Sequence, residues 1–175
     1  MAGNRIVILV VSLVTCLALQ SCRDRRASSP ASDANALTIA PGAGMGPVRF
    51  GAPKETVIAA LGKPESTDAG GLALMYPSRG FTVCVHPRAG FFSVSCYTRK
   101  AAPPDLLVCD FAGKTSAGIG MGASRSQIIA AYGKADNETS TSGQVELYYA
   151  TTGMRFVLLN DQLIQLMMER PPKPK

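Results

Sequence analysis

A segment that occurs twice constrains this 175-residue chain more than any other feature of its sequence. Residues 46–64 and 117–135 share a glycine turn, an apolar stretch and a closing Gly-Lys pair, at an offset of 71 residues. Tyr76 and Tyr149 follow the two copies, and by that point the offset has drifted to 73. Because a repeated spacing specifies one supersecondary unit twice, the chain is predicted to contain two tandem halves with one plan.

Each half is predicted to contain a short helix. In the second half, Ser124 is a suitable N-cap and Gln127 completes a capping box, while Gly133 suits the left-handed position after the last turn. In the first half, Pro53 suits the first helical position and Gly62 the end. Helices of two to three turns are not stable alone, so each must pack on a sheet.

Alternating apolar residues predict a β-hairpin in each half, with loops at 87–90 and 160–162. Residues 72–76 and 144–149 are predicted to add a further strand to each hairpin, and residues 37–39 a short lead-in strand with a counterpart at 108–110. The predicted pairs are Val85 with Phe92, Val83 with Val94, Phe81 with Cys96, Leu158 with Ile164, Phe156 with Leu166, and Met154 with Met168. The predicted fold class is α+β, with two tandem repeats that each pack a short helix on an antiparallel sheet of about three to four strands. Whether the two sheets join is left open.

The predicted organisation has five segments. They are a lipoprotein signal peptide at 1–21, a lipidated Cys and flexible tether at 22–40, repeat 1 at 41–100, a connection and repeat 2 at 101–170, and a basic Pro-rich tail at 171–175. The tether prediction rests on small, polar and proline-punctuated residues, which favour flexible chain.

The N-terminus has the features of a secretory signal. Arg5 precedes a 14-residue apolar run at 6–19, which is shorter than the roughly 20 residues of a spanning helix. Residues 19–22, Leu-Gln-Ser-Cys, follow directly and resemble the lipobox of bacterial lipoprotein signal peptides. The resemblance implies cleavage before Cys22 and acylation of that residue. The alternative is ordinary secretion with a coincidental cysteine.

Lipidation at Cys22 would anchor the chain, because several acyl chains on one residue exceed the threshold for stable membrane binding. Basic residues at 23–26 would lie beside anionic headgroups, or would simply belong to a solvated tether. By resemblance to enteric sorting, Arg23 in place of an aspartate favours the outer membrane. The predicted location is therefore the cell envelope, lipid-anchored, on the periplasmic side of the outer membrane.

Three cysteines remain after Cys16 leaves with the signal peptide and Cys22 is lipidated. Cys84, Cys96 and Cys109 would lie in an oxidising compartment, where disulfides persist. Cys84 and Cys96 are predicted on opposite faces of one hairpin, outside disulfide geometry. Cys109 could therefore pair with Cys84 or with Cys96, or all three could be free.

The sequence offers no catalytic site, metal site or cofactor loop. His86 is the only histidine, and it has neither a triad partner nor the companions of a zinc site. The glycines at 41–46 lack the strand, the long helix and the Lys-Ser/Thr pair of a phosphate loop, and are predicted to form a turn. The formal net charge of +6 is scattered rather than gathered in a stripe with aromatic residues, which disfavours nucleic-acid binding.

A candidate binding face remains on the side of the predicted sheets away from the helices. Its predicted members are Phe91, Tyr97, Arg155, Val157, Leu159, Leu163 and Met167. Aromatic, methionine and arginine side chains are enriched in protein interfaces. The competing interpretation is that the other half, or the 101–109 connection, covers this face.

The repeated motif resembles the SmpA/OmlA/β-lactamase-inhibitor-protein superfamily over about residues 44–169. The resemblance is carried by Gly51, Val57, Leu61, Gly62 and Pro64 in the first half, and by Gly122, Ile128, Tyr132 and Gly133 in the second. The family implies small exported modules in which a helical layer packs on an antiparallel sheet. Single copies occur in outer-membrane lipoproteins of the barrel-assembly machinery, and tandem copies in the secreted β-lactamase inhibitor. This chain has no Trp, so the inhibitor's aromatic-rich binding face is reduced here.

The expected function is that of a membrane-anchored, non-enzymatic lipoprotein that binds another envelope protein, in outer-membrane assembly or integrity. The alternative is a proteinaceous inhibitor of a periplasmic hydrolase. The expected partners are the membrane, through the lipid anchor, and an envelope protein. No cofactor, metal or nucleic acid is expected.

Overall fold

The computed structural model describes residues 37–102 and 107–172, which belong to one compact unit, Asn35–Lys175. The predicted signal peptide, Cys22, most of the predicted tether and residues 173–175 lie outside the described residues. Within them the protein is mostly β, with twelve strands, two eight-residue α-helices and one short 3-10 helix, η2 (Pro77–Arg79).

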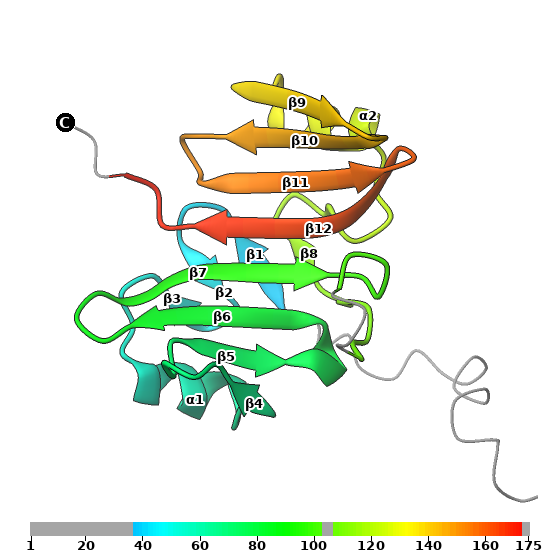
Figure 1. Ribbon diagram of the computed structural model, residues 1–175. Coiled ribbons are helices and arrows are strands. Elements are labelled where there is room, and N and C mark those ends of the chain that lie inside the picture. The colour runs from blue at the N-terminus through cyan, green and yellow to red at the C-terminus, as the bar shows by residue number, and fades with distance from the viewer. Residues whose placement is uncertain (1–36, 103–106, 173–175) are drawn as a thin grey trace, which may run out of the picture. The chain divides into compact units, whose positions relative to one another are not determined.

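The larger sheet has eight strands, each antiparallel to its neighbours (Figure 1). Their order is β4 (Ser66–Thr67), β5 (Ala73–Tyr76), β6 (Phe81–His86), β7 (Gly90–Tyr97), β12 (Gln162–Glu169), β11 (Met154–Leu159), β10 (Gln144–Tyr149) and β9 (Asn137–Thr141). Each half therefore runs inward from an edge of the sheet, the first from β4 to β7 and the second from β9 to β12.

The two halves meet through the pairing of β7 with β12. Cys96 pairs with Leu166, and Ser93 pairs with Glu169. Cys96 and Glu169 are 73 residues apart, and so are Ser93 and Leu166, so the repeat offset converts one pair into the other. An approximate two-fold axis between β7 and β12 requires this relation. The duplication in the sequence therefore appears in the sheet as approximate two-fold symmetry.

The prediction of an α+β fold with two helix-on-sheet repeats is wrong. The structure is mostly β, and the strands of both halves form one continuous sheet rather than two sheets of three to four strands. The error has a physical reason: β7 and β12 are each predicted from local alternation, but their pairing joins segments more than 65 residues apart, and nothing in a local pattern specifies it.

A second sheet of four short strands covers part of one face of the large sheet. Its order is β3 (Val48–Arg49), β2 (Gly44–Met45), β1 (Thr38–Ala40) and β8 (Lys114–Thr115), with β1 and β8 parallel. Strand β1 confirms the lead-in strand predicted at 37–39, whereas β2 lies in the glycine-rich segment that was predicted to be only a turn, and the predicted strand at 108–110 is absent. Ile39 is fully buried, so the end of the predicted tether belongs to the folded core.

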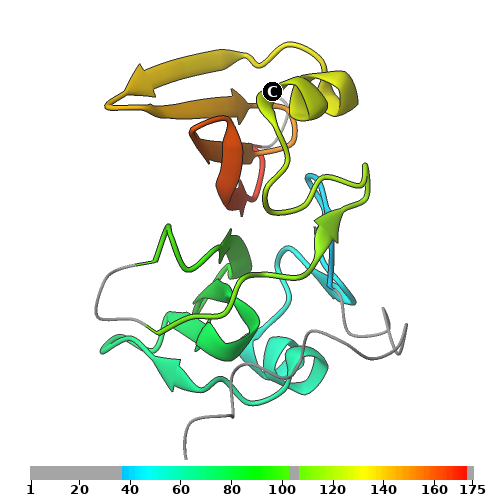
Figure 2. The ribbon, with the colours of Figure 1, turned by 90° about the vertical axis from the view of Figure 1, so that its right-hand side faces the viewer.

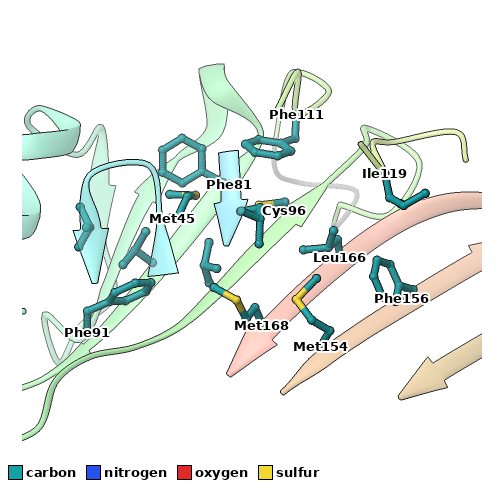
Figure 3. Close-up of a cluster of buried hydrophobic side chains, with 14 of the residues drawn as sticks. Met45, Phe81, Phe91, Cys96, Phe111, Ile119, Met154, Phe156, Leu166 and Met168 are labelled. Carbon is teal, nitrogen blue, oxygen red and sulfur yellow. The ribbon is translucent and has the colours of Figure 1, made fainter. Parts of the chain in front are cut away.

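Both helices lie on the same side of the large sheet as the small sheet (Figure 2). Helix α1 (Lys54–Leu61) packs against β3 and β7, and α2 (Arg125–Tyr132) lies in the second half. The core between these layers is apolar and contiguous (Figure 3). It includes Met45 from the small sheet, Phe81, Phe91 and Cys96 from the first half, and Phe156, Leu166 and Met168 from the second.

Most of the predicted hairpin register is confirmed, and each hairpin has one irregularity. The confirmed pairs are Val83 with Val94, Phe81 with Cys96, Phe156 with Leu166, and Met154 with Met168. A shift between Cys84 and Val85 pairs Val85 with Phe91 rather than Phe92, and a shift between Val157 and Leu158 pairs Leu158 with Leu163 rather than Ile164. A bulge adds one residue to one strand, so the residues beyond it change face.

Three of the four predicted helix ends are confirmed; the exception is Pro53, which is the N-cap of α1 and not its first helical residue. Ser124 and Gln127 form the capping box of α2, and Gly62 and Gly133 close the two helices with φ of 89° and 80°. The tyrosine on the second strand of each half ties the helix end to the sheet. Tyr76 donates a hydrogen bond to the carbonyl of Gly62 at 2.8 Å, and Tyr149 donates one to that of Gly133 at 3.0 Å.

Candidate functional site

The face of the large sheet opposite the small sheet is not covered by any element within residues 37–102 and 107–172 (Figure 1). Cross-strand register places on it the side chains of every second residue of each strand. Across the central strands these are Thr82, Cys84, Ser93, Ser95, Tyr97, Gln165, Met167, Glu169, Arg155, Val157, Leu159, Glu146 and Tyr148. We call this set the open face.

Five of the seven predicted face residues lie on the open face. Arg155, Leu159 and Met167 are partly exposed, whereas Tyr97 and Val157 are nearly buried between neighbouring side chains. The assignments of Phe91 and Leu163 to this face are wrong. Each precedes the extra residue of a bulge in its strand, which reverses the side on which it lies, and both are fully buried in the core.

The centre of the open face is held by polar contacts. The hydroxyls of Tyr97 and Thr82 share a hydrogen bond of 2.6 Å across β6 and β7. Burial raises the pKa of the Tyr97 hydroxyl, and the hydrogen bond with Thr82 partly offsets that effect. Tyr97 therefore stays protonated near neutral pH and presents a fixed hydroxyl rather than a charge.

A charged and aromatic group lies next to this centre, on the second half of the face. The guanidinium of Arg155 lies 3.3 Å from the carboxylate of Glu146, and its carbon is 5.5 Å from the centroid of the Tyr148 ring. Arg155 is paired directly with Met167 in the ladder. Tyr148 and Glu146 were missed from the sequence, although the strict alternation along 144–149 could have placed them.

Two cavities lie away from the open face, and neither was expected from the sequence. One, of about 460 Å³, is lined by Arg99, Lys100 and Asp110 beside apolar Met121, Leu163 and Ile164. The Asp110 carboxylate accepts a hydrogen bond from the backbone N–H of Arg99 at 2.7 Å, which accounts for it structurally. The other, of about 390 Å³, lies at the start of α1 beside the β6–β7 turn.

His86 has a structural role in that turn. Its Nδ1 accepts hydrogen bonds from the backbone N–H groups of Arg88 and Ala89, at 3.1 and 3.2 Å. In the part of the chain that the structure describes, no three His, Cys, Asp or Glu side chains are grouped as metal ligands. The described helices also include none with the length and apolar character needed to cross a bilayer.

The three cysteines are free thiols in the structure. Cys96 is buried on the core side, Cys84 is partly buried on the open face, and Cys109 is exposed. This arrangement corresponds to the alternative of three free thiols, and not to a bridge from Cys109 to Cys84 or Cys96. Burial strongly raises the pKa of the Cys96 thiol, so its reactive thiolate form is suppressed.

We therefore expect a strict order of alkylation by a maleimide. In the native protein Cys109 should be labelled first, Cys84 more slowly, and Cys96 only after unfolding, because access falls in that order and burial also suppresses the thiolate of Cys96. Mass spectrometry of the labelled peptides measures the order. If two of the three stay unlabelled in denaturant until a reductant is added, a disulfide exists and the free-thiol arrangement is wrong.

Comparison with known proteins adds little to this geometry. No protein-family model and no curated protein sequence matches the chain. Among solved structures, the chain is similar to a DUF4309 family protein (YjgB) from Bacillus subtilis. The two share 13% sequence identity at a TM-score of 0.43, over 67% of this chain and 77% of the other.

Proposed function

We propose that this protein is a non-enzymatic envelope lipoprotein that is anchored to the membrane through Cys22 and uses the open face to bind another envelope protein. The observation that carries the proposal is an eight-stranded sheet with one face left uncovered by the described residues. Antiparallel sheets commonly leave one face to solvent, but such a face is then usually polar. This one carries Val157, Leu159 and Met167.

The composition of the face fits a protein partner better than a small ligand. Arg155 is held between a carboxylate and a tyrosine ring, so less side-chain entropy is lost when it binds. Arginine and tyrosine are also the residues that most often dominate binding energy in protein interfaces. Ser93, Ser95 and Gln165, on the two central strands, would supply polar contacts beside this group.

Anchoring rests on the sequence at residues 19–22, and the role in outer-membrane assembly or integrity rests on the location and the family resemblance. A direct test of the anchor is Cys22→Ser. We expect the variant to leave the membrane fraction and appear among soluble envelope proteins. A variant that still pellets with the membrane would contradict anchoring through Cys22.

Site-specific photo-crosslinking of the full-length protein in cells tests the binding face. A photoreactive residue at Met167 should form an adduct of discrete mass with an envelope protein, and Arg155→Glu on the same chain should lower its yield at least about tenfold, which corresponds to roughly 1.4 kcal/mol. The matched control is the same photoreactive residue at Ala131, which is exposed on the helix side.

The outcomes separate the candidate functions. An adduct with a membrane-assembly or cell-wall protein supports the proposal. An adduct with a soluble hydrolase whose activity falls on binding replaces it with the inhibitor function. Equal adducts from Met167 and Ala131 would show that the open face is not the binding surface.

A further inference from the structure

The two edges of the large sheet differ in how they are protected. At one edge, β4 has only two residues, follows Pro64, and is succeeded by Asp68, whose carboxylate accepts a hydrogen bond from the Ala73 N–H at 2.8 Å. At the other edge, β9 has five residues, and all five are exposed. Natural proteins shorten or block edge strands because free edges pair with other chains. By that criterion β4 is protected and β9 is not.

The hairpin geometry identifies which backbone groups of β9 point outward. A two-residue turn, Ser142 and Gly143 with φ of 51° and 81°, joins β9 to β10. Such a turn makes Thr141 and Gln144 a hydrogen-bonded pair, and bonded pairs alternate along an antiparallel ladder. Asn137, Thr139 and Thr141 therefore bond to β10. The N–H and C=O groups of Glu138 and Ser140 point toward the free edge.

The side chains of β9 do not guard this edge. The strand contains no proline and no lysine, and Glu138 carries its only charge. That carboxylate lies on the helix side, where it accepts two hydrogen bonds from the Arg125 guanidinium, at 2.7 and 3.1 Å. These bonds lower the pKa of Glu138 and balance its charge locally. Little repulsion is left to keep another strand away.

We propose that β9 pairs antiparallel with β9 of a second copy of this chain, with Thr139 on the two-fold axis. In this register Glu138 of each copy lies opposite Ser140 of the other, and the outward groups form four backbone hydrogen bonds. Thr139 of one chain lies opposite Thr139 of the other, and two threonines are a favourable cross-strand pair. The neighbouring register, with Glu138 opposite Glu138, is disfavoured because Ser140 would then face Asp136, whose N–H already donates to the Tyr148 carbonyl at 2.9 Å. The inference goes beyond the proposed function, because it uses an edge and not the open face.

Disulfide trapping in the full-length protein tests the register. In a background of Cys84→Ser and Cys109→Ser, Thr139→Cys should give a covalent dimer on mild oxidation, because residues at a non-bonded antiparallel pair have Cα atoms about 4.5 Å apart. Asn137→Cys alone and Thr141→Cys alone should give no covalent dimer. In each case the two introduced cysteines would lie four residues apart along the paired strands, about 13 Å at about 3.3 Å per residue. Co-expressed, these two should give the mixed dimer, because they lie opposite each other.

Ser140→Pro on the Thr139→Cys chain provides the matched control. It removes an outward N–H that does not bond to β10, so the melting temperature should change little while the dimer yield falls at least tenfold. The unmodified background chain gives the level of non-specific oxidation. Equal trapping of the single Cys variants at 137, 139 and 141, or a dimer that survives Ser140→Pro, would overturn the proposal. So would trapping of Thr139→Cys onto a different protein, which would assign the edge to another partner. Because crosslinking at Met167 is measured separately, failure here leaves the proposed function standing.

Discussion

Phe91→Ala is expected to lower the free energy of unfolding by about 3–5 kcal/mol, whereas Phe92→Ala should cost less than about 1 kcal/mol. Phe91 is fully buried, and its ring centroid lies 4.9 Å from that of Phe50. Phe92 is 36% exposed at the bulge between β6 and β7. Urea unfolding of the two variants, followed by circular dichroism, measures both values with the same chemical change at adjacent positions.

The comparison also tests which face each phenylalanine occupies. If the register had no bulge, Phe92 would face the core opposite Val85 and Phe91 would lie on the open face. The two costs would then be exchanged. Similar costs at both positions would contradict the structure as well, because Phe91 is fully buried and Phe92 is exposed.

Gly153→Ala should be nearly as damaging, with a loss of roughly 2–5 kcal/mol. Gly153 has φ of +66°, which costs a residue with a Cβ about 1–2 kcal/mol. A Cβ there would also overlap the carbonyl oxygen of Glu169 at the end of β12, and relieving such an overlap costs about 1–3 kcal/mol. The two backbone segments cannot easily move apart to relieve the overlap, because the Glu169 N–H donates a hydrogen bond to the Gly153 carbonyl at 2.9 Å.

Gly118→Ala separates the two causes. Gly118 has φ of +83°, and a Cβ there would meet nothing within 4 Å. It should therefore show only the backbone cost of about 1–2 kcal/mol. Thermal unfolding of both variants measures the difference. Equal losses would mean that the approach of β12 to Gly153 contributes nothing.

The features of the fold that could be predicted from the sequence are those that depend on residues close together in the chain. Ser124, Gln127 and Gly133 mark the ends of α2 because capping depends on residues within one turn of helix. Alternation placed Phe81 opposite Cys96 and Met154 opposite Met168 because a short loop fixes the register of a hairpin. The repeat predicted that both halves would share these features, and the bonds from Tyr76 and Tyr149 to the helix ends confirm it.

The rest depended on contacts that no local pattern contains. The bulges at Cys84/Val85 and Val157/Leu158 add one residue without a glycine or proline to mark them, so Phe91 and Leu163 were placed on the wrong face. Strands of two residues, such as β2 and β8, are too short to show alternation. The two halves are joined by the pairing of β7 with β12, and only the tertiary structure shows that pairing.

The position of β12 has a consequence for how the chain reaches its native state. This strand follows all the others in sequence, yet it lies at the centre of the large sheet between β7 and β11. Until it arrives, the β7 side of the sheet is an unpaired edge of eight residues, Gly90–Tyr97, with high β-propensity. Because a chain is made from its N-terminus, this edge stays unpaired until residues 162–169 follow. The seam between the halves is therefore the point at which an incomplete chain is most open to misassembly, and the point that a chaperone would need to protect.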